Sequence, residues 1–144
     1  MYNKLTGTIP TEIGKMKELL ELDLFFNELT GTIPTELGQM ENLQMMELNN
    51  NALNGTLPAE LGNLSNLNRL KLHQNKITGT VPQSYKKLKN LVDVDITWGN
   101  EIKGDIGILC EIDGLTIWIY CGQEFFTEDT CNCCTCWQMR SENS

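Results

Sequence analysis

Hydrophobic and polar positions along this chain repeat every 24 residues. The skeleton LQMMELNNNALNGTLP at residues 43–58 returns as LLELDLFFNELTGTIP from residue 19 and as LNRLKLHQNKITGTVP from residue 67. A fixed period of this length is typical of a solenoid, in which each repeat packs only on its neighbours. The residues that keep the spacing are Pro10, Pro34, Pro58 and Pro82, Asn3, Asn27, Asn51 and Asn75, and Gly7, Gly31, Gly55 and Gly79.

Each repeat carries an L-x-L core that alternates with a period of two, which predicts a short strand with one face buried. We expect strands near residues 20–25, 44–49, 68–73 and 92–97. Stacked about 4.8 Å apart, such strands form a parallel sheet over one continuous apolar column. The inward side chains are Leu22, Leu24, Met46, Leu48, Leu70, Leu72, Val94 and Ile96.

Polar and small residues mark where each repeat turns. The asparagines Asn27, Asn51 and Asn75 follow the strands, and their amides can satisfy turn backbone on neighbouring repeats. The prolines keep the chain from continuing a regular ladder. After each proline, an apolar spacing of three predicts a short helical or 3₁₀ turn on the convex side.

Written as a consensus, the unit reads L-x-x-L-x-L-x-x-N-x-L-x-G-x-I-P-x-x-L-G-x-L. It resembles the leucine-rich repeat family, of the plant-type subclass marked by L-x-G-x-I-P, over residues 3 to about 109. The wording LTGTIP-T-E-LG also resembles leucine-rich repeat proteins of diatoms and related algae, in which the array ends in a small cysteine cluster. The resemblance implies an α/β solenoid, or horseshoe, with a short-stranded parallel concave sheet and a convex side of 3₁₀ or short helices.

Two regions are expected, a repeat array at 1–109 and a cysteine-rich cap at 110–144. The fifth repeat drifts, because Gly104 follows Gly79 by 25 residues, and one inserted residue near Trp98 and Gly99 explains the shift. The segment at 115–120, LTIWIY, is apolar on both faces and fits a terminal strand under a cap.

All the cysteines lie in the predicted cap. Six cysteines near a solenoid end indicate three disulfides, which allow 15 pairings, although bonding of Cys133 to Cys134 fits disulfide geometry poorly. The alternative is a soft metal, but the spacing matches no zinc finger, and His73 lies far away in the array. We therefore predict disulfides and no metal site at Cys110, Cys121, Cys131, Cys133, Cys134 and Cys136.

Charge and compartment narrow the class of partner. The net charge is −8, which disfavours nucleic acid and anionic membrane surfaces. No apolar run reaches the roughly 18 residues of a membrane helix, and no signal peptide is visible.

The chain starts within a repeat and has no N-terminal cap, so we expect a fragment of a longer receptor-like or secreted protein. Disulfides indicate an extracellular or cell-surface location.

The outward residues of the strands form columns on the concave face. Two of the predicted columns are Phe25, Asn49, His73 and Thr97, and Phe26, Asn50, Gln74 and Trp98. Candidate ligand-binding residues are Phe25, Phe26, Glu47, Asn49, Arg69, Lys71, His73, Asp93, Asp95 and Trp98. Charged residues with a few aromatics suit a partner's polar surface. The alternative explanation is self-pairing across repeats, of Arg69 with Asp93 and of Lys71 with Asp95 and Glu47.

Function is expected to be recognition without catalysis. Asp93 and Asp95 lie about 7 Å apart between Cα atoms, but an exposed strand offers no pocket to raise one pKa. No catalytic motif or cofactor site is present in the sequence. The predicted partner is a protein, a peptide or a cell-wall saccharide, and the resemblance implies receptor-like kinase ectodomains or free inhibitor and adhesion proteins.

The alternative is a structural or surface-associated protein of the cell wall or of ice. A Thr-Gly-Thr motif recurs around Gly7, Gly31 and Gly79, with Asn-Gly-Thr around Gly55. A regular array of threonines can match an ordered lattice. The ordinary explanation is the preference of threonine for a second short strand.

Overall fold

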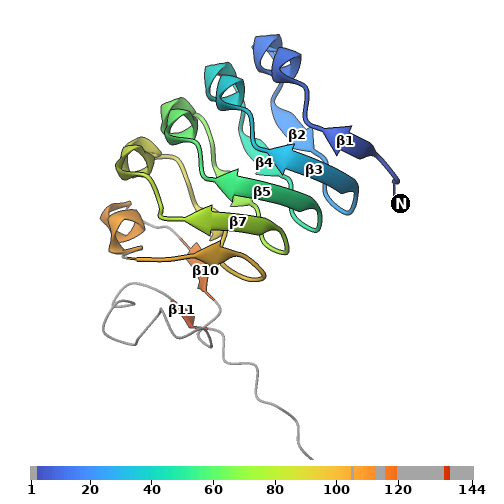
Figure 1. The fold of residues 1–144 in the computed structure, drawn as a ribbon. Coiled ribbons are helices and arrows are strands. Elements are labelled where there is room, and N and C mark those ends of the chain that lie inside the picture. The colour runs from blue at the N-terminus through green and yellow to red at the C-terminus, as the bar shows by residue number, and fades with distance from the viewer. Residues whose placement is uncertain (1–2, 105, 113–115, 120–134, 137–144) are drawn as a thin grey trace, which may run out of the picture.

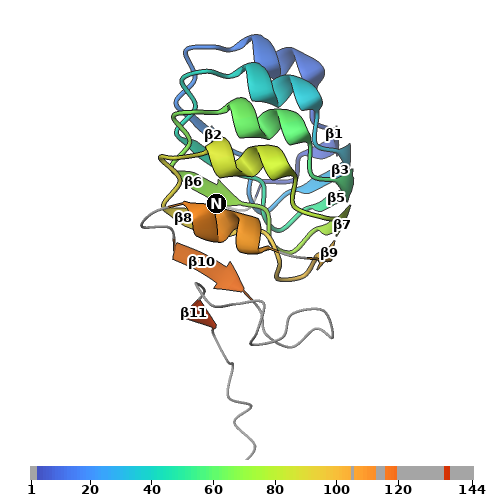
Figure 2. The ribbon, with the colours of Figure 1, turned by 90° about the vertical axis from the view of Figure 1, so that its left-hand side faces the viewer.

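The computed structural model describes residues 3–104, 106–112, 116–119 and 135–136. Within these residues the chain winds as a solenoid in which each repeat adds one short strand, a second strand and a 3₁₀ helix (Figure 1). Figure 2 shows the helices stacked one above another, with one sheet on either side.

Two parallel sheets run along the solenoid. The six-stranded sheet has the order β11-β10-β8-β6-β4-β2, and the five-stranded sheet has the order β1-β3-β5-β7-β9. The six-stranded sheet contains β2 (Glu21–Asp23), β4 (Met45–Glu47), β6 (Arg69–Lys71), β8 (Asp93–Asp95), β10 (Thr116–Ile119) and β11 (Thr135–Cys136). The five-stranded sheet contains β1 (Thr6–Thr8), β3 (Glu28–Thr32), β5 (Ala52–Thr56), β7 (Lys76–Gly79) and β9 (Glu101–Ile102).

The 3₁₀ helices form the third layer. They are η1 (Thr11–Lys15), η2 (Thr35–Gln39), η3 (Ala59–Asn63), η4 (Gln83–Lys87) and η5 (Gly107–Glu111). The first four begin directly after a proline, as the apolar spacing predicts. Proline suits this place because its missing N–H would have no partner in the first turn.

The predicted apolar column forms the core. Met46, Leu70 and Val94 are fully buried under the six-stranded sheet, and Leu24 at the first repeat is half-buried. Leu37, Leu61 and Tyr85 close the column from the helical layer. The strands β4, β6 and β8 pair with a register shift of 24 residues, so equivalent side chains stack directly.

The asparagine ladder is confirmed. Asn75 accepts a hydrogen bond from the backbone N–H of Leu53 and donates to the carbonyls of Leu48 and Leu72, at 2.9–3.0 Å. Asn51 makes the corresponding bonds one repeat earlier. Asn100 continues the ladder after the drift, donating to the carbonyl of Leu72 at 2.9 Å. Each amide therefore ties its own turn to the preceding repeat.

The five-stranded sheet accounts for the threonine motif. The Thr78 hydroxyl donates to the Gly55 carbonyl at 3.2 Å, and Thr30 does the same to Gly7. At Gly55, φ is +77°, and an added Cβ would lie 2.8 Å from the methyl group of Thr32. Glycine is therefore required there by both backbone conformation and space.

The first repeat presents apolar side chains to solvent. Leu5, Met16, Leu20, Phe25 and Phe26 are each between 37% and 52% exposed. Among the described residues, no helix is long and apolar enough to cross a membrane, and no three potential metal ligands gather. The predicted disulfide cap cannot be compared, because the side chains of all six cysteines lie outside the described residues.

Candidate ligand-binding surface

The outward face of the six-stranded sheet is acidic. On β2, β4, β6 and β8, two cations, Arg69 and Lys71, face five carboxylates. The five are Glu21, Asp23, Glu47, Asp93 and Asp95. This surface is exposed at β2 and half-buried from β4 to β8.

Ion pairs cross the repeats, as the self-pairing explanation predicts. Arg69 lies between Glu47, with Nη1 3.4 Å from Oε1, and Asp93, with Nε 3.2 Å from Oδ2. Lys71 Nζ contacts Oδ1 of Asp93, which lies diagonally across the sheet from it. The predicted partner, Asp95, lies directly opposite Lys71 in the register. The carboxylates of Glu47 and Asp93 therefore already balance the two cations.

Asp95 faces the only histidine of the chain. Its Oδ2 lies 3.1 Å from Nδ1 of His73, and this nitrogen has no hydrogen-bond partner among the described residues. Burial raises the pKa of Asp95 to about 6. The charge of Lys71 and a backbone hydrogen bond from Trp98 lower this pKa by smaller amounts, and the charge of Asp93 raises it. Burial and then the charge of Lys71 lower the pKa of His73. Burial therefore favours the neutral forms of both side chains.

The inserted residue lies one place earlier than the sequence indicates. The Gln74 N–H donates to the carbonyl of Trp98, whereas the Asn50 N–H donates to that of His73. Trp98 thus takes the place of His73 one repeat later. The amide of Asn100 donates to the Ile96 carbonyl, as that of Asn75 does to Leu72, so the extra residue is Thr97.

This bulge corrects the predicted columns. Trp98 stands in the column of Phe25, Asn49 and His73, where we expected Thr97. Its indole stacks on the imidazole of His73, with ring centroids 5.5 Å apart and 19° between the planes. Thr97 is buried at 4% exposure instead of facing outward, because the extra residue turns into the repeat.

The candidate residues divide by exposure. Phe25, Phe26 and Trp98 are 37–41% exposed, and the two phenylalanine rings make an edge contact at 5.5 Å. Asn49 is only 7% exposed, contrary to the open position expected for it. The sequence does not predict this burial, because it results from the packing of neighbouring repeats and not from the residue type of Asn49.

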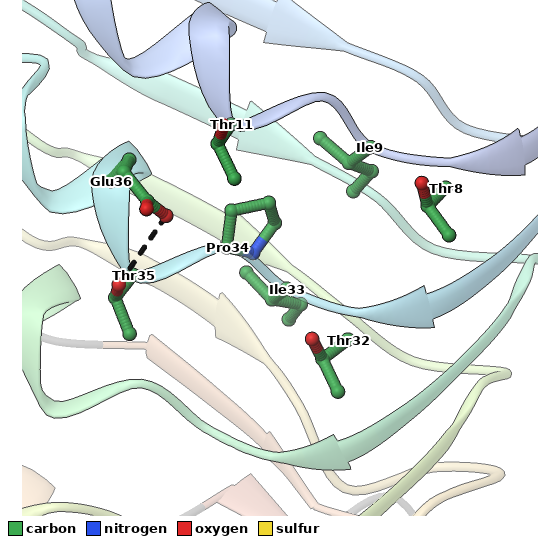
Figure 3. A pocket seen from close by; sticks show the side chains of 8 residues that line it. All are labelled: Thr8, Ile9, Thr11, Thr32, Ile33, Pro34, Thr35 and Glu36. Carbon is green, nitrogen blue, oxygen red and sulfur yellow. Dashed lines mark hydrogen bonds between the residues drawn. The ribbon is translucent and has the colours of Figure 1, made fainter.

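The first two repeats form a hollow where β1 and β3 lead into η1 and η2 (Figure 3). A cavity of about 380 Å³ lies between them, lined by Thr8, Ile9, Thr11, Thr32, Ile33, Pro34, Thr35 and Glu36. The Thr35 hydroxyl donates to Glu36 at 3.3 Å. The threonine face is therefore not flat at this end.

Comparison with known proteins agrees with this geometry. Residues 18–40 and 42–64 match the family model described as Leucine Rich Repeat. The chain carries leucine-rich repeats and folds as a leucine-rich-repeat solenoid. No curated protein sequence matches it significantly.

Solved structures of plant receptor ectodomains are similar to it. The plant peptide hormone receptor RGFR1 in complex with RGF2 shares 38% identity at a TM-score of 0.78, over 81% of this chain and 19% of that one. The ectodomain of GASSHO1/SCHENGEN3 from Arabidopsis thaliana, in complex with CASPARIAN STRIP INTEGRITY FACTOR 2, shares 36% identity at 0.77, over 81% of this chain and 14% of that one. The SOBIR1 ectodomain from Arabidopsis thaliana shares 30% identity at 0.76, over 85% and 66%. The chain thus spans a fifth or less of the two receptors solved with ligands.

Proposed function

We propose that this chain is an extracellular, non-catalytic recognition module that binds a protein or peptide on the outward face of the six-stranded sheet. The observation that carries the proposal is the presence of exposed aromatics after β2 and after β8, with the acidic strands β4 and β6 between them. Phe25, Phe26 and Trp98 provide large contact areas with few rotatable bonds, which is typical of binding hot spots.

The likeness to receptor ectodomains supports a peptide as the ligand. RGFR1 and GASSHO1/SCHENGEN3 were each solved with a peptide or factor bound, and both resemble this chain over four fifths of its length. These partners belong to those proteins. For this chain they favour the same class of ligand, and they favour an extracellular or cell-surface location.

The charges of the face support binding without catalysis. Asp93 is held between Arg69 and Lys71, so its carboxylate is committed to structural ion pairs. Asp95 lies against His73 at 14% side-chain exposure. Neither carboxylate has the combination of solvent access and a free partner that a general acid or base needs.

The test is selection of peptides on the purified chain. A random 12-residue peptide library is displayed, and enriched peptides are synthesised and titrated by calorimetry. The double variant Phe25→Ser/Trp98→Ser is expected to lose about tenfold or more in affinity, since each hot-spot side chain contributes over about 1 kcal/mol. A matched control, Glu12→Gln/Glu41→Gln near the helical layer, is expected to bind like the wild type. Equal binding by both variants would place the ligand elsewhere.

A cell-wall saccharide is the alternative ligand on the same face. Sedimentation with insoluble polysaccharide, repeated with Phe25→Ser/Trp98→Ser, separates it from a peptide. Retention that depends on these two aromatics, without enrichment of any peptide, would replace the peptide by a saccharide.

Adsorption to an ordered lattice is the second candidate function. It rests on Thr8, Thr32, Thr56 and Thr80, which are all exposed at the same place in successive repeats. The cavity between the first two repeats and the use of Thr30 and Thr78 hydroxyls inside the sheet weigh against it. Thermal hysteresis that disappears in Thr32→Val/Thr56→Val/Thr80→Val would establish lattice binding, and its absence in the wild type would end the idea.

A further inference from the structure

Three polar atoms on the outward face are buried without a hydrogen-bond partner among the described residues. They are Oδ1 of Asn49, Nδ1 of His73 and Oδ1 of Asp95. We call Asn49, His73, Asp95 and Trp98 together the acceptor notch. Buried polar atoms are nearly always paired in folded proteins, so three in one place require an explanation.

The register brings these atoms together. Glu47 pairs with Lys71 across β4 and β6, which sets Asn49 beside His73 two residues further on. The N–H of Asn50 donates to the His73 carbonyl at 3.0 Å and holds the two turns in this order. On the other side, His73 Nδ1 lies 3.1 Å from the carboxylate of Asp95. Asn49 and Asp95 therefore flank His73.

The chemistry of the two oxygen atoms defines what they lack. An amide oxygen and a carboxylate oxygen only accept hydrogen bonds, so the missing partner is a donor. Arg69 is held by Glu47 and Asp93, and Lys71 contacts Asp93, so the charge of Lys71 acts on Asp95 without a hydrogen bond to its Oδ1. Asp95 belongs to a face on which five carboxylates meet two cations, so the remaining negative charge favours a further cation here. The missing partner is thus a positively charged donor.

The aromatic pair indicates the shape of that donor. His73 and Trp98 present planar rings stacked nearly parallel, and Trp98 is 39% exposed. A guanidinium group is planar, stacks on aromatic rings and carries five N–H donors in its plane. An ammonium group lacks the plane. Flat stacking with acceptors on either side matches a guanidinium.

We propose that the acceptor notch binds the guanidinium group of an arginine side chain of the peptide ligand, which makes this inference dependent on the function proposed above. The arginine donates to Asp95 Oδ1 and Asn49 Oδ1, and the indole of Trp98 moves from His73 onto the guanidinium plane. His73 forms the base of the notch between the two acceptors.

A small probe tests the notch without any knowledge of the full ligand. Nα-acetyl-arginine N-methylamide is titrated into the whole chain, and its neutral citrulline counterpart serves as the matched probe. Binding is followed by NMR through the imidazole signals of His73, which are unique because the chain has one histidine. Saturable shifts are expected with the arginine probe, with affinity at least about tenfold above that of citrulline. Equal shifts with both probes would overturn the proposal.

Variants distinguish binding in the acceptor notch from electrostatic attraction to the acidic face as a whole. Asp95→Asn is expected to abolish the shifts, and Asp23→Asn, an exposed carboxylate on the same face, is expected to preserve them. Asn49→Leu is expected to weaken the arginine probe several-fold while raising the denaturation midpoint, because it removes an unpaired buried acceptor. A lower midpoint would show that Asn49 is satisfied within the fold and would overturn the proposal.

The two proposals can fail separately. If selected peptides bind the aromatic face but replacement of their arginines by citrulline leaves affinity unchanged, the arginine inference fails and the recognition function stands. If the arginine probe binds the notch while no peptide is enriched, the notch stands and the peptide-binding function fails.

Discussion

The indole of Trp98 stacks nearly parallel to the imidazole of His73, with ring centroids 5.5 Å apart, although the two residues are 25 positions apart in a chain that repeats every 24. The extra residue, Thr97, makes the contact possible, since it moves Trp98 into the column of His73. A regular fifth repeat would have placed threonine there and left the tryptophan in the next column.

Two single deletions test this relationship. Deletion of Thr97 restores the 24-residue period and keeps Trp98 opposite His73, so the ring-current shift of the His73 protons is expected to persist. Deletion of Gly99 restores the same period but puts Thr97 opposite His73, and the shift is expected to disappear. Both variants are compared with the wild type by one-dimensional NMR. Persistence of the shift in the Gly99 deletion would show that the insertion lies elsewhere.

The asparagine ladder is expected to carry much of the stability. Asn75→Ala leaves the Leu53 N–H unpaired inside the solenoid, while the carbonyls of Leu48 and Leu72 each keep one of their two amide donors. An unpaired buried group costs about 1–3 kcal/mol, and the two carbonyl bonds are lost in addition, so we expect a loss of about 3 kcal/mol in the free energy of unfolding. Urea denaturation measures it.

The matched control for the ladder is Asn27→Ala. This residue makes the same kind of bonds, but it accepts from Leu5 N–H at the exposed first repeat. Water can replace the lost partners there, and the expected loss is about 1 kcal/mol. Equal losses at the two positions would contradict the view that burial sets the cost.

Close stacking of the helical layer depends on Gly38. A Cβ at this position would lie 2.6 Å from the carbonyl carbon and 2.8 Å from the Cβ of Glu60 in the next repeat. The backbone of η3 cannot yield easily, so Gly38→Ala is expected to cost about 3 kcal/mol. Thermal denaturation measures the loss.

The control in the same helix is Thr35→Ala, which introduces the residue that already occupies the equivalent position as Ala59. Thr35 is exposed, so the melting temperature of the Thr35→Ala variant is expected to stay near that of the wild type. If Gly38→Ala and Thr35→Ala have the same melting temperature, then neighbouring repeats can move apart at this position without loss of stability.

Asp95 is expected to make stability depend on pH. Its pKa rises from 3.8 to about 6 on folding, so between these values the folded chain holds a proton that the unfolded chain has lost. The contribution of this group to stability therefore falls as pH rises from about 4 to 6 and stays low above that. The lowered pKa of His73 acts in the opposite sense, adding stability as pH rises toward 6.5.

Asp95→Asn isolates the carboxylate. The amide keeps the acceptor for the Trp98 N–H but cannot ionise, so we expect a gain of about 3 kcal/mol at pH 7.5 and little change at pH 4. Urea denaturation at the two pH values gives the comparison, with Asp23→Asn on exposed β2 as the control. A gain of the same size at both pH values would rule out ionisation as the cause.

The sequence by itself determined the solenoid, its core column, the 3₁₀ turns and the asparagine ladder. These features recur in every repeat, and each depends on a local pattern: alternation, a proline before a turn, or an amide at a strand exit. Repetition made the signal strong, because the same residue types met the same demands several times.

Only the tertiary structure decided what the face of the sheet looks like. The partner of Lys71, the place of Trp98 and the burial of Asn49 all depend on side chains from neighbouring repeats, and on one bulge at Thr97 that shifts a column by one residue. Such choices are made between residues about 24 positions apart. They follow from how neighbouring repeats pack, which the pattern within one repeat does not contain.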